Sequence, residues 1–159
     1  MTFQPEPWSD AEADIRKLVD AHWKELAVFQ REIKLDIDWQ NYRDLAERES
    51  LPRLQLTTAR TTGRDLAGYW ISVINLHPHY KGTVFAFQDS YFVLPQYRKA
   101  NTGLGLMVEM EKNCRLAGAQ CIISSDKEHQ SVKPLFDWCK FSSVGTQYQK
   151  WIGGDLCLG

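Results

Sequence analysis

The chain has 159 residues, with 19 lysines and arginines against 20 aspartates and glutamates, and a net charge of −1. This balance argues against a protein that binds nucleic acid through bulk charge, because neutralising phosphates requires a basic surplus. With 43% hydrophobic residues and no stretch near the roughly 20 apolar residues of a membrane helix, the composition predicts one domain over residues 1–159 that does not enter a membrane. Because residues 1–10 lack an apolar signal core, we expect it in the cytoplasm.

Two helices are expected in the N-terminal third. Residues 9–12 have the capping-box pattern, a hydroxyl followed three residues later by a carboxylate, so the first helix should begin at Ser9. Apolar residues then recur at helical spacing from Ile15 to Leu26. His22 lies on this stripe, and we interpret it as a core or boundary histidine. A second helix is expected over Trp39–Glu49, capped by Asp38.

Three strands should follow as an antiparallel meander, because the connections between them are short. Alternating or β-rich patterns cover Leu54–Thr58, Leu66–Leu76 and Thr83–Leu94, separated by turn-like residues at 61–65 and 77–82. Side chains alternate along a strand, so Gln88 and Ser90 are expected to point away from Asp89 and Tyr91.

The residue pattern of the last third of the chain predicts a long helix flanked by shorter elements. The helix opens at Gly103 and should end near Gly118, a residue type suited to the left-handed position after a helix. We expect a buried strand over 120–124, a short helix over 132–140, a last strand over 143–151 and a loose tail over 152–159.

The loop before the long helix has the features of an anion-binding site. Arg98 and Lys99 supply positive charge, and glycines at a helix start let a phosphate approach the backbone N–H groups. A Walker loop would need Lys and Ser or Thr after Gly105, and a dinucleotide fold would need a small residue where Val108 stands. Neither pattern is met.

The run Phe92-Val93-Leu94-Pro95-Gln96-Tyr97-Arg98, followed by Gly103-Leu104-Gly105 and Glu111, resembles the acetyl-coenzyme A motif of the GNAT N-acetyltransferases, most closely the compact bacteriophage-encoded members. The resemblance covers roughly residues 54–152. It implies an α/β GNAT fold: a mixed, mostly antiparallel central sheet, two N-terminal helices, a central cofactor-binding helix and a short C-terminal helix. It also implies acetyl-coenzyme A as co-substrate and direct attack by a primary amine in a ternary complex.

The resemblance also implies roles for individual residues. The cofactor would lie against Phe92, Val93, Leu94, Arg98, Lys99, Ala100, Asn101, Thr102, Gly103, Leu104, Gly105 and Leu106. Ala100 departs from the glutamine or arginine of the family pattern. Asp89 is the expected base, since an attacking amine must lose its proton, and the substrate would meet His79, Tyr80 and Gln88. Phe136 stands where many members have a proton-donating tyrosine, which leaves Tyr148, Ser124, His129 and solvent as alternatives.

Several alternatives stay open at this point. Cys114, Cys121, Cys139 and Cys157 and the four histidines lack the close spacing of metal ligands, so no metal is expected. The partner would be an amine acceptor, either a protein or a small molecule, and a homodimer is left open. A second hypothesis is a catalytically degenerate GNAT scaffold that binds and inhibits a host protein. An acetyltransferase acting on a modified nucleic-acid base has poor electrostatic support.

Overall fold

The computed structural model describes residues 1–26, 35–98 and 101–148. Their strands form one five-stranded sheet in chain order. Neighbouring strands are antiparallel except for the last pair, which is parallel. The mixed, mostly antiparallel sheet expected from the sequence is therefore confirmed. The strands are β1 (Thr2–Pro5), β2 (Arg53–Arg60), β3 (Leu66–Leu76), β4 (Val84–Val93) and β5 (Cys121–Ile123).

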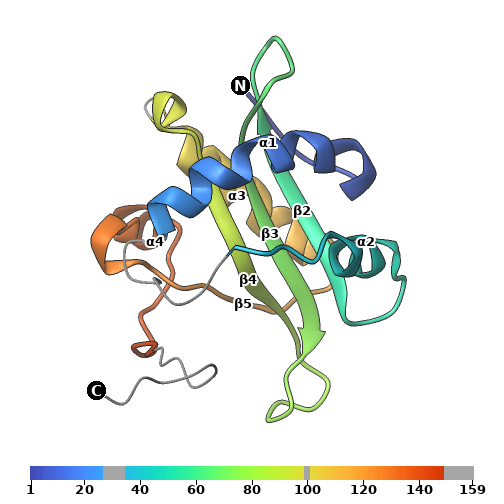
Figure 1. Cartoon of the computed structure of the whole chain (residues 1–159). Coiled ribbons are helices and arrows are strands. Elements are labelled where there is room, and N and C mark those ends of the chain that lie inside the picture. The colour runs from blue at the N-terminus through green and yellow to red at the C-terminus, as the bar shows by residue number, and fades with distance from the viewer. Residues whose placement is uncertain (27–34, 99–100, 149–159) are drawn as a thin grey trace, which may run out of the picture.

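Helices cover both faces of the sheet (Figure 1). On one face lie α1 (Trp8–Leu26) and α2 (Trp39–Glu47), and on the other lies α3 (Thr102–Leu116), which connects β4 to β5. Two short 3₁₀ helices, η2 (Pro95–Tyr97) and η3 (Glu128–Gln130), precede α3 and α4 (Lys133–Trp138). Within the described ranges, no helix combines the length and apolar character that crossing a bilayer requires.

The sheet separates two apolar cores. Alternation along the strands sends every second side chain to each face, so Trp70 packs toward α3 while its neighbours Tyr69 and Ile71 pack toward α1. The α3 face is filled mainly by Ala59, Ala67, Trp70, Ile74, Ala86, Val93, Leu106, Met107, Met110 and Cys114. The opposite face is filled mainly by Trp8, Ala11, Ile15, Leu56, Leu66, Tyr69, Ile71 and Phe92.

The N-terminus differs from its sequence prediction. Residues 2–5 form β1, an edge strand paired with the end of β2, and α1 begins at Trp8, ahead of the expected cap Ser9. The Ser9 hydroxyl bonds instead to the adjacent Asp10 carboxylate. The buried Arg60 of β2 reaches Glu6 (2.6 Å between Nη2 and Oε1) and Asp14 of α1 (2.9 Å). These ion pairs tie the first residues to the sheet.

Most other boundaries agree with the sequence. The Asp38 carboxylate accepts the Asn41 N–H at 2.9 Å and caps α2. Gly118 follows α3 with a φ of +87°, the left-handed conformation that favours glycine. The last strand expected over 143–151 does not form in its described part, where residues 143–148 have no regular structure; the rest of that prediction and the expected tail fall outside the described residues.

A β-bulge interrupts β4 at Asp89. Ile71 of β3 pairs with Ser90, but the next residue, Ser72, pairs with Gln88, so Asp89 is an extra residue on β4. A bulge re-aims side chains locally. Asp89 and Ser90 consequently both line a pocket on the α1 face, which corrects the strict alternation expected from the sequence.

Gly68 lets β3 approach the end of β4 closely. A Cβ atom at this position would lie 2.7 Å from the carbonyl oxygen of Phe92 and 3.1 Å from the Cα of Val93. Because both obstacles are backbone atoms, Gly68→Ala should force the strands apart and lower the free energy of unfolding by about 1–3 kcal/mol. Urea unfolding would measure the loss. Gly63→Ala is the matched control, since its Cβ would meet only side-chain oxygens at 3.6 Å and beyond; equal stability of both variants would contradict the packing argument.

Candidate functional site

A cleft opens where β4 and β5 separate. The two strands pair only from Phe85–Cys121 to Phe87–Ile123, after which β4 continues to Val93 without β5 beside it. The space between β4 and the segment that follows β5 forms a cleft of about 610 Å³. Its walls comprise Gln88–Val93 of β4, His22 and Glu25 of α1, Arg98, Asn101, Gly103 and Leu104 before and within α3, and residues from Ser125–Lys127 and Gln130–Leu135.

One end of the cleft is the start of α3. The first turn of a helix leaves backbone N–H groups without acceptors inside the helix and carries a partial positive charge. Gly103 and Leu104 of this turn line the cleft. A Cβ at Gly103 would lie 2.6 Å from the Tyr91 hydroxyl, so glycine lets this side chain and the helix approach each other. The arrangement suits an anion in the cleft.

Arg98 links the cleft walls. Its Nε donates to the Val93 carbonyl at 2.9 Å, and its Nη2 contacts the Glu25 carboxylate at 2.5 Å. Glu25 also accepts from the Gln130 amide at 2.8 Å, which joins the end of α1 to the segment after β5. An anion entering this end of the cleft would therefore compete with Glu25 for the guanidinium group.

A second cavity of about 220 Å³, here called the aromatic pocket, lies between α1, α2 and the sheet. Most of its lining is apolar: five aromatic and five aliphatic side chains, with His22, Asp89 and Ser90 as the polar residues. The aromatic residues are Trp8, Trp23, Trp39, Tyr42 and Tyr69, and the aliphatic ones are Ile15, Val19, Leu35, Ile37 and Ile71.

The cleft and the aromatic pocket meet at His22, Asp89 and Ser90, which line both. The Tyr42 hydroxyl donates to Asp89 Oδ2 at 2.6 Å and fixes the carboxylate. Burial, together with the negative charge of Asp89, raises the pKa of Tyr42, so its hydroxyl keeps its proton. A ligand in the cleft and a ligand in the pocket would thus approach each other at one carboxylate.

His22 is a part of this junction that the sequence did not single out. Its Nδ1 lies 2.7 Å from the Tyr69 hydroxyl, and its ring stacks on Phe92 with centroids 4.7 Å apart. Burial lowers the pKa of His22 to about 4, so the imidazole is neutral at pH 7. The sequence correctly indicated a buried histidine, but its position on an apolar helix stripe gives no signal that two cavities meet there.

The structure brings together some of the residues that were predicted to bind the cofactor. Phe92, Val93, Arg98, Asn101, Gly103 and Leu104 line the cleft with Asp89 and Gln88. Leu106 is fully buried against the sheet, and Thr102 is also buried. A Cβ at Gly105 would collide with the Phe3 ring at 2.4 Å, so this glycine serves helix packing against β1. Leu94 packs into the core of the α1 face. Lys99 and Ala100 lie outside the described residues.

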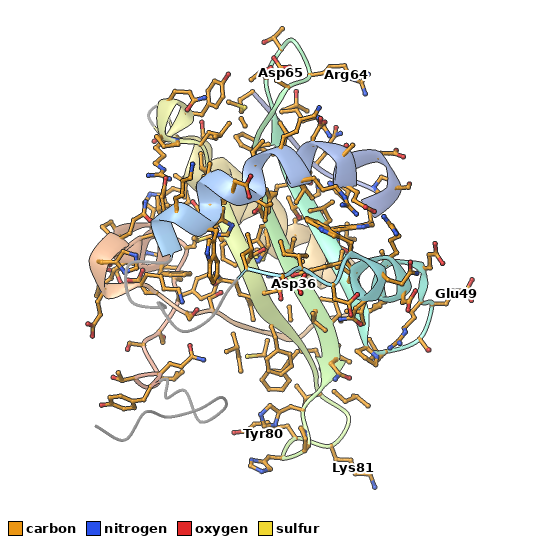
Figure 2. All side chains as sticks on the ribbon, in the orientation of Figure 1. Asp36, Glu49, Arg64, Asp65, Tyr80 and Lys81 are labelled. Carbon is orange, nitrogen blue, oxygen red and sulfur yellow. The ribbon has the colours of Figure 1, made fainter. Side chains whose placement is uncertain are left out.

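The other predicted residues are more scattered. His79 and Tyr80 lie in the β3–β4 hairpin, at the far end of β4 from the start of α3, and line neither cavity (Figure 2). Tyr148 is 89% exposed. Ser124 lies just after β5; its hydroxyl is buried and has no hydrogen-bond partner in the described part of the chain. His129 Nε2 contacts the Glu25 carbonyl at 2.9 Å.

Cys114 does not resemble a nucleophile. It is 1% exposed in the core beneath α3, and burial raises the pKa of its thiol to about 11. A reactive cysteine needs an accessible thiolate, which this environment disfavours. Cys114 is therefore unsuited to form a covalent intermediate.

No protein-family model and no curated protein sequence matches the chain. Its fold, however, matches solved acetyltransferase structures over nearly their whole length. A ribosomal-protein-alanine N-acetyltransferase from Brucella melitensis aligns with a TM-score of 0.71 and 14% identity, covering 96% of this chain and 98% of that one. Glucosamine-6-phosphate N-acetyltransferase from Arabidopsis thaliana gives 0.69 and 13%, covering 96% and 100%.

An aminoglycoside 6′-N-acetyltransferase from Acinetobacter baumannii gives a TM-score of 0.63 and 18% identity, covering 96% of this chain and 99% of that one. At such identities the likeness establishes the fold, and the activities named are those of the neighbours. The α/β fold of the GNAT acetyltransferases, expected from the sequence, is therefore confirmed.

The environment of His22 predicts a pH-dependent stability. Its pKa is about 4 in the folded chain against about 6.5 when unfolded, so the unfolded chain takes up a proton first as the pH falls. The stability that neutral His22 contributes is complete above about pH 6.5 and is lost toward pH 4. The loss amounts to about 2 kcal/mol at pH 5. Urea unfolding at pH 7 and pH 5 should show a smaller loss for His22→Gln than for the unmodified chain. His79→Gln, on the exposed hairpin, is the control; an unchanged loss in His22→Gln would contradict the assignment.

Proposed function

We propose that the protein transfers an acetyl group from acetyl-coenzyme A to a primary amine by direct attack in a ternary complex. The observation that carries the proposal is the shared wall: the cleft and the aromatic pocket meet at His22, Asp89 and Ser90. Two ligands bound on either side would bring their reacting groups together, and such positioning supplies much of the rate of a two-substrate reaction. The fold shared with acetyltransferases supports the same conclusion.

The cleft suits acetyl-coenzyme A, the carrier of the acetyl group. Its volume of about 610 Å³ is in the range of small-molecule and cofactor sites. The diphosphate would lie at the start of α3, near Arg98 and the N–H groups of Gly103 and Leu104, and the pantetheine arm along the part of β4 that lines the cleft beyond its pairing with β5, up to Val93. The carrier supplies an activated thioester. The chain binds it, and Arg98 exchanges Glu25 for a phosphate.

Asp89 is the proposed base. An amine attacks only when unprotonated, and a lysine-like amine is largely charged at neutral pH. The Asp89 carboxylate, held by Tyr42 and exposed to both cavities, can accept that proton directly or through one water. Neutral His22 adds no positive charge that would repel the ammonium group before it loses its proton.

One feature favours the second candidate function, a scaffold that binds a host protein without catalysis. Phe136, which stands where many family members have a tyrosine, has no hydroxyl and cannot protonate a leaving thiolate; its ring packs against Phe141 with centroids 5.1 Å apart and contacts the core under α3. Tyr91 is among the residues that line the cleft, and burial raises the pKa of its hydroxyl to about 12. Tyr91 or solvent would have to donate this proton in the catalytic case.

The first experiment tests the carrier. A ligand that binds only the folded state raises the melting temperature in a saturable way, so acetyl-coenzyme A should stabilise the protein. Gly103→Leu should abolish this shift, because its side chain would enter the space beside Tyr91 and block the start of α3. Val108→Leu, exposed on the same helix, should keep it. No shift at millimolar acetyl-coenzyme A would overturn the proposal.

The second experiment separates an enzyme from a binding protein. Asp89→Asn removes the base but keeps the shape of the side chain, so the rate of amine acetylation, followed by release of free thiol, should fall by about 100-fold or more. The thermal shift with acetyl-coenzyme A should remain. Asp44→Asn on the exposed side of α2 is the control. Acetylation at an undiminished rate in Asp89→Asn would exclude Asp89 as the base.

A further inference from the structure

The aromatic pocket has one formal charge in its described lining. Asp89 is the acidic residue there, and no lysine or arginine accompanies it. His22 is neutral, since its pKa lies near 4, and burial raises the pKa values of Tyr42 and Tyr69 so that both hydroxyls keep their protons. A single carboxylate on the wall of a largely apolar pocket attracts one cation, and Asp89 is exposed enough for a ligand to reach it.

The aromatic rings favour the same kind of ligand. Tyr42 stacks on Trp8 with centroids 5.0 Å apart and planes 9° from parallel, and Trp39 lies 6.4 Å from Trp8. Such rings attract a cation through their electron-rich faces. From outside the pocket, the Arg16 guanidinium already lies 4.2 Å from the centre of the Trp39 ring. Because Trp8 and Tyr42 cover one face of each other, these rings chiefly offer an apolar wall to the body of a ligand whose ammonium group contacts Asp89.

The carboxylate is held with one oxygen available. Tyr42 donates to Asp89 Oδ2, and the bulge places Ser90 beside Asp89 on the pocket wall. Within the described residues, no group donates a hydrogen bond to Oδ1. An ammonium group could bind Oδ1 without breaking any contact of the folded chain.

The composition of the pocket discriminates among amines. Compounds with several ammonium groups, such as polyamines and aminoglycosides, need several carboxylates, and phosphorylated or carboxylated amines need a cation; the described lining offers neither. The pocket also has room for an apolar body. A cavity of about 150 Å³ holds a benzene molecule, so 220 Å³ accommodates one ring with a short side chain.

We propose that the acceptor is a primary monoamine with an apolar, ring-sized body, which lies among Trp8, Trp39 and Tyr42 with its ammonium group on Asp89. The chemical step rests on the proposed acetyl transfer, whereas the binding step does not. In that step Asp89 or a water takes one proton from the ammonium group, and the nitrogen forms a bond to the thioester carbonyl carbon. The carbon–sulfur bond then breaks, a second proton leaves the nitrogen, and the thiolate takes up a proton.

Binding is tested first, without any carrier, by titrating tryptophan fluorescence and confirming each affinity by calorimetry. The probe is 2-phenylethylamine. Phenylacetate has the same ring and the opposite charge, and spermidine has several charges and no ring. We expect 2-phenylethylamine to bind at least about tenfold more tightly than either, because a charge-assisted contact to Asp89 is lost in one and the ring contacts are lost in the other. Equal affinity for phenylacetate would overturn the inference.

Variants locate the binding site. Asp89→Asn should weaken 2-phenylethylamine binding by about tenfold or more, and Tyr42→Phe should weaken it less, because the ring remains and only the hydrogen bond to Asp89 is lost. Asp44→Asn, which lines neither cavity, should bind as the unmodified chain does. Unchanged affinity in Asp89→Asn would overturn the assignment. Circular dichroism of each variant shows whether the fold is kept.

Turnover separates the proposed acetyl transfer from the proposed acceptor. If 2-phenylethylamine binds through Asp89 but no acetylated product forms with acetyl-coenzyme A, the proposal of acetyl transfer is wrong and the assignment of the pocket as an amine site holds. If spermidine, an aminoglycoside or glucosamine 6-phosphate is acetylated faster than 2-phenylethylamine, acetyl transfer holds and the acceptor class proposed here is wrong.

Discussion

The site depends on how briefly β4 and β5 stay together. Their parallel pairing ends at Phe87 and Ile123, and the chain then sends β4 toward the start of α3 while the segment after β5 turns toward α4 (Figure 1). Had the pairing continued, backbone hydrogen bonds and side chains would fill the space that forms the cleft. The bulge at Asp89 lies just beyond this point, so the carboxylate appears where the strands part.

The second requirement is that α1 and α2 keep fixed positions relative to each other. Glu12 of α1 accepts hydrogen bonds from the Trp8 indole at 2.9 Å and from Arg43 of α2 at 2.6 Å. The hydrogen bond from Arg43, aided by those from Arg16 and Trp8, lowers the pKa of Glu12 to about 2, so the carboxylate stays charged and the link persists at neutral pH. Two walls of the aromatic pocket, Trp8 and Tyr42, are thereby held relative to each other.

Local patterns predicted most of the architecture. Strand alternation, the Asp38 cap and Gly118 are visible within a few residues, and the GNAT resemblance of the loop before α3 pointed to the cleft and to Asp89. β1 was missed because its four residues become a strand only by pairing with residues more than fifty positions away. The bulge and the position of His22 between the two cavities depend on the register between β3 and β4 and on the crossing of α1 over β4. Such long-range relations leave no signature in one sequence.

The junction at Asp89 also bears on how a turnover would end. In the proposed reaction, an acceptor would enter the aromatic pocket as an ammonium ion and leave it as an uncharged amide. The amide would no longer attract the carboxylate, although its apolar body would still fit the rings, so the reaction would cancel the contact that favoured entry. A site built around one anion would thus prefer the next incoming amine over the product.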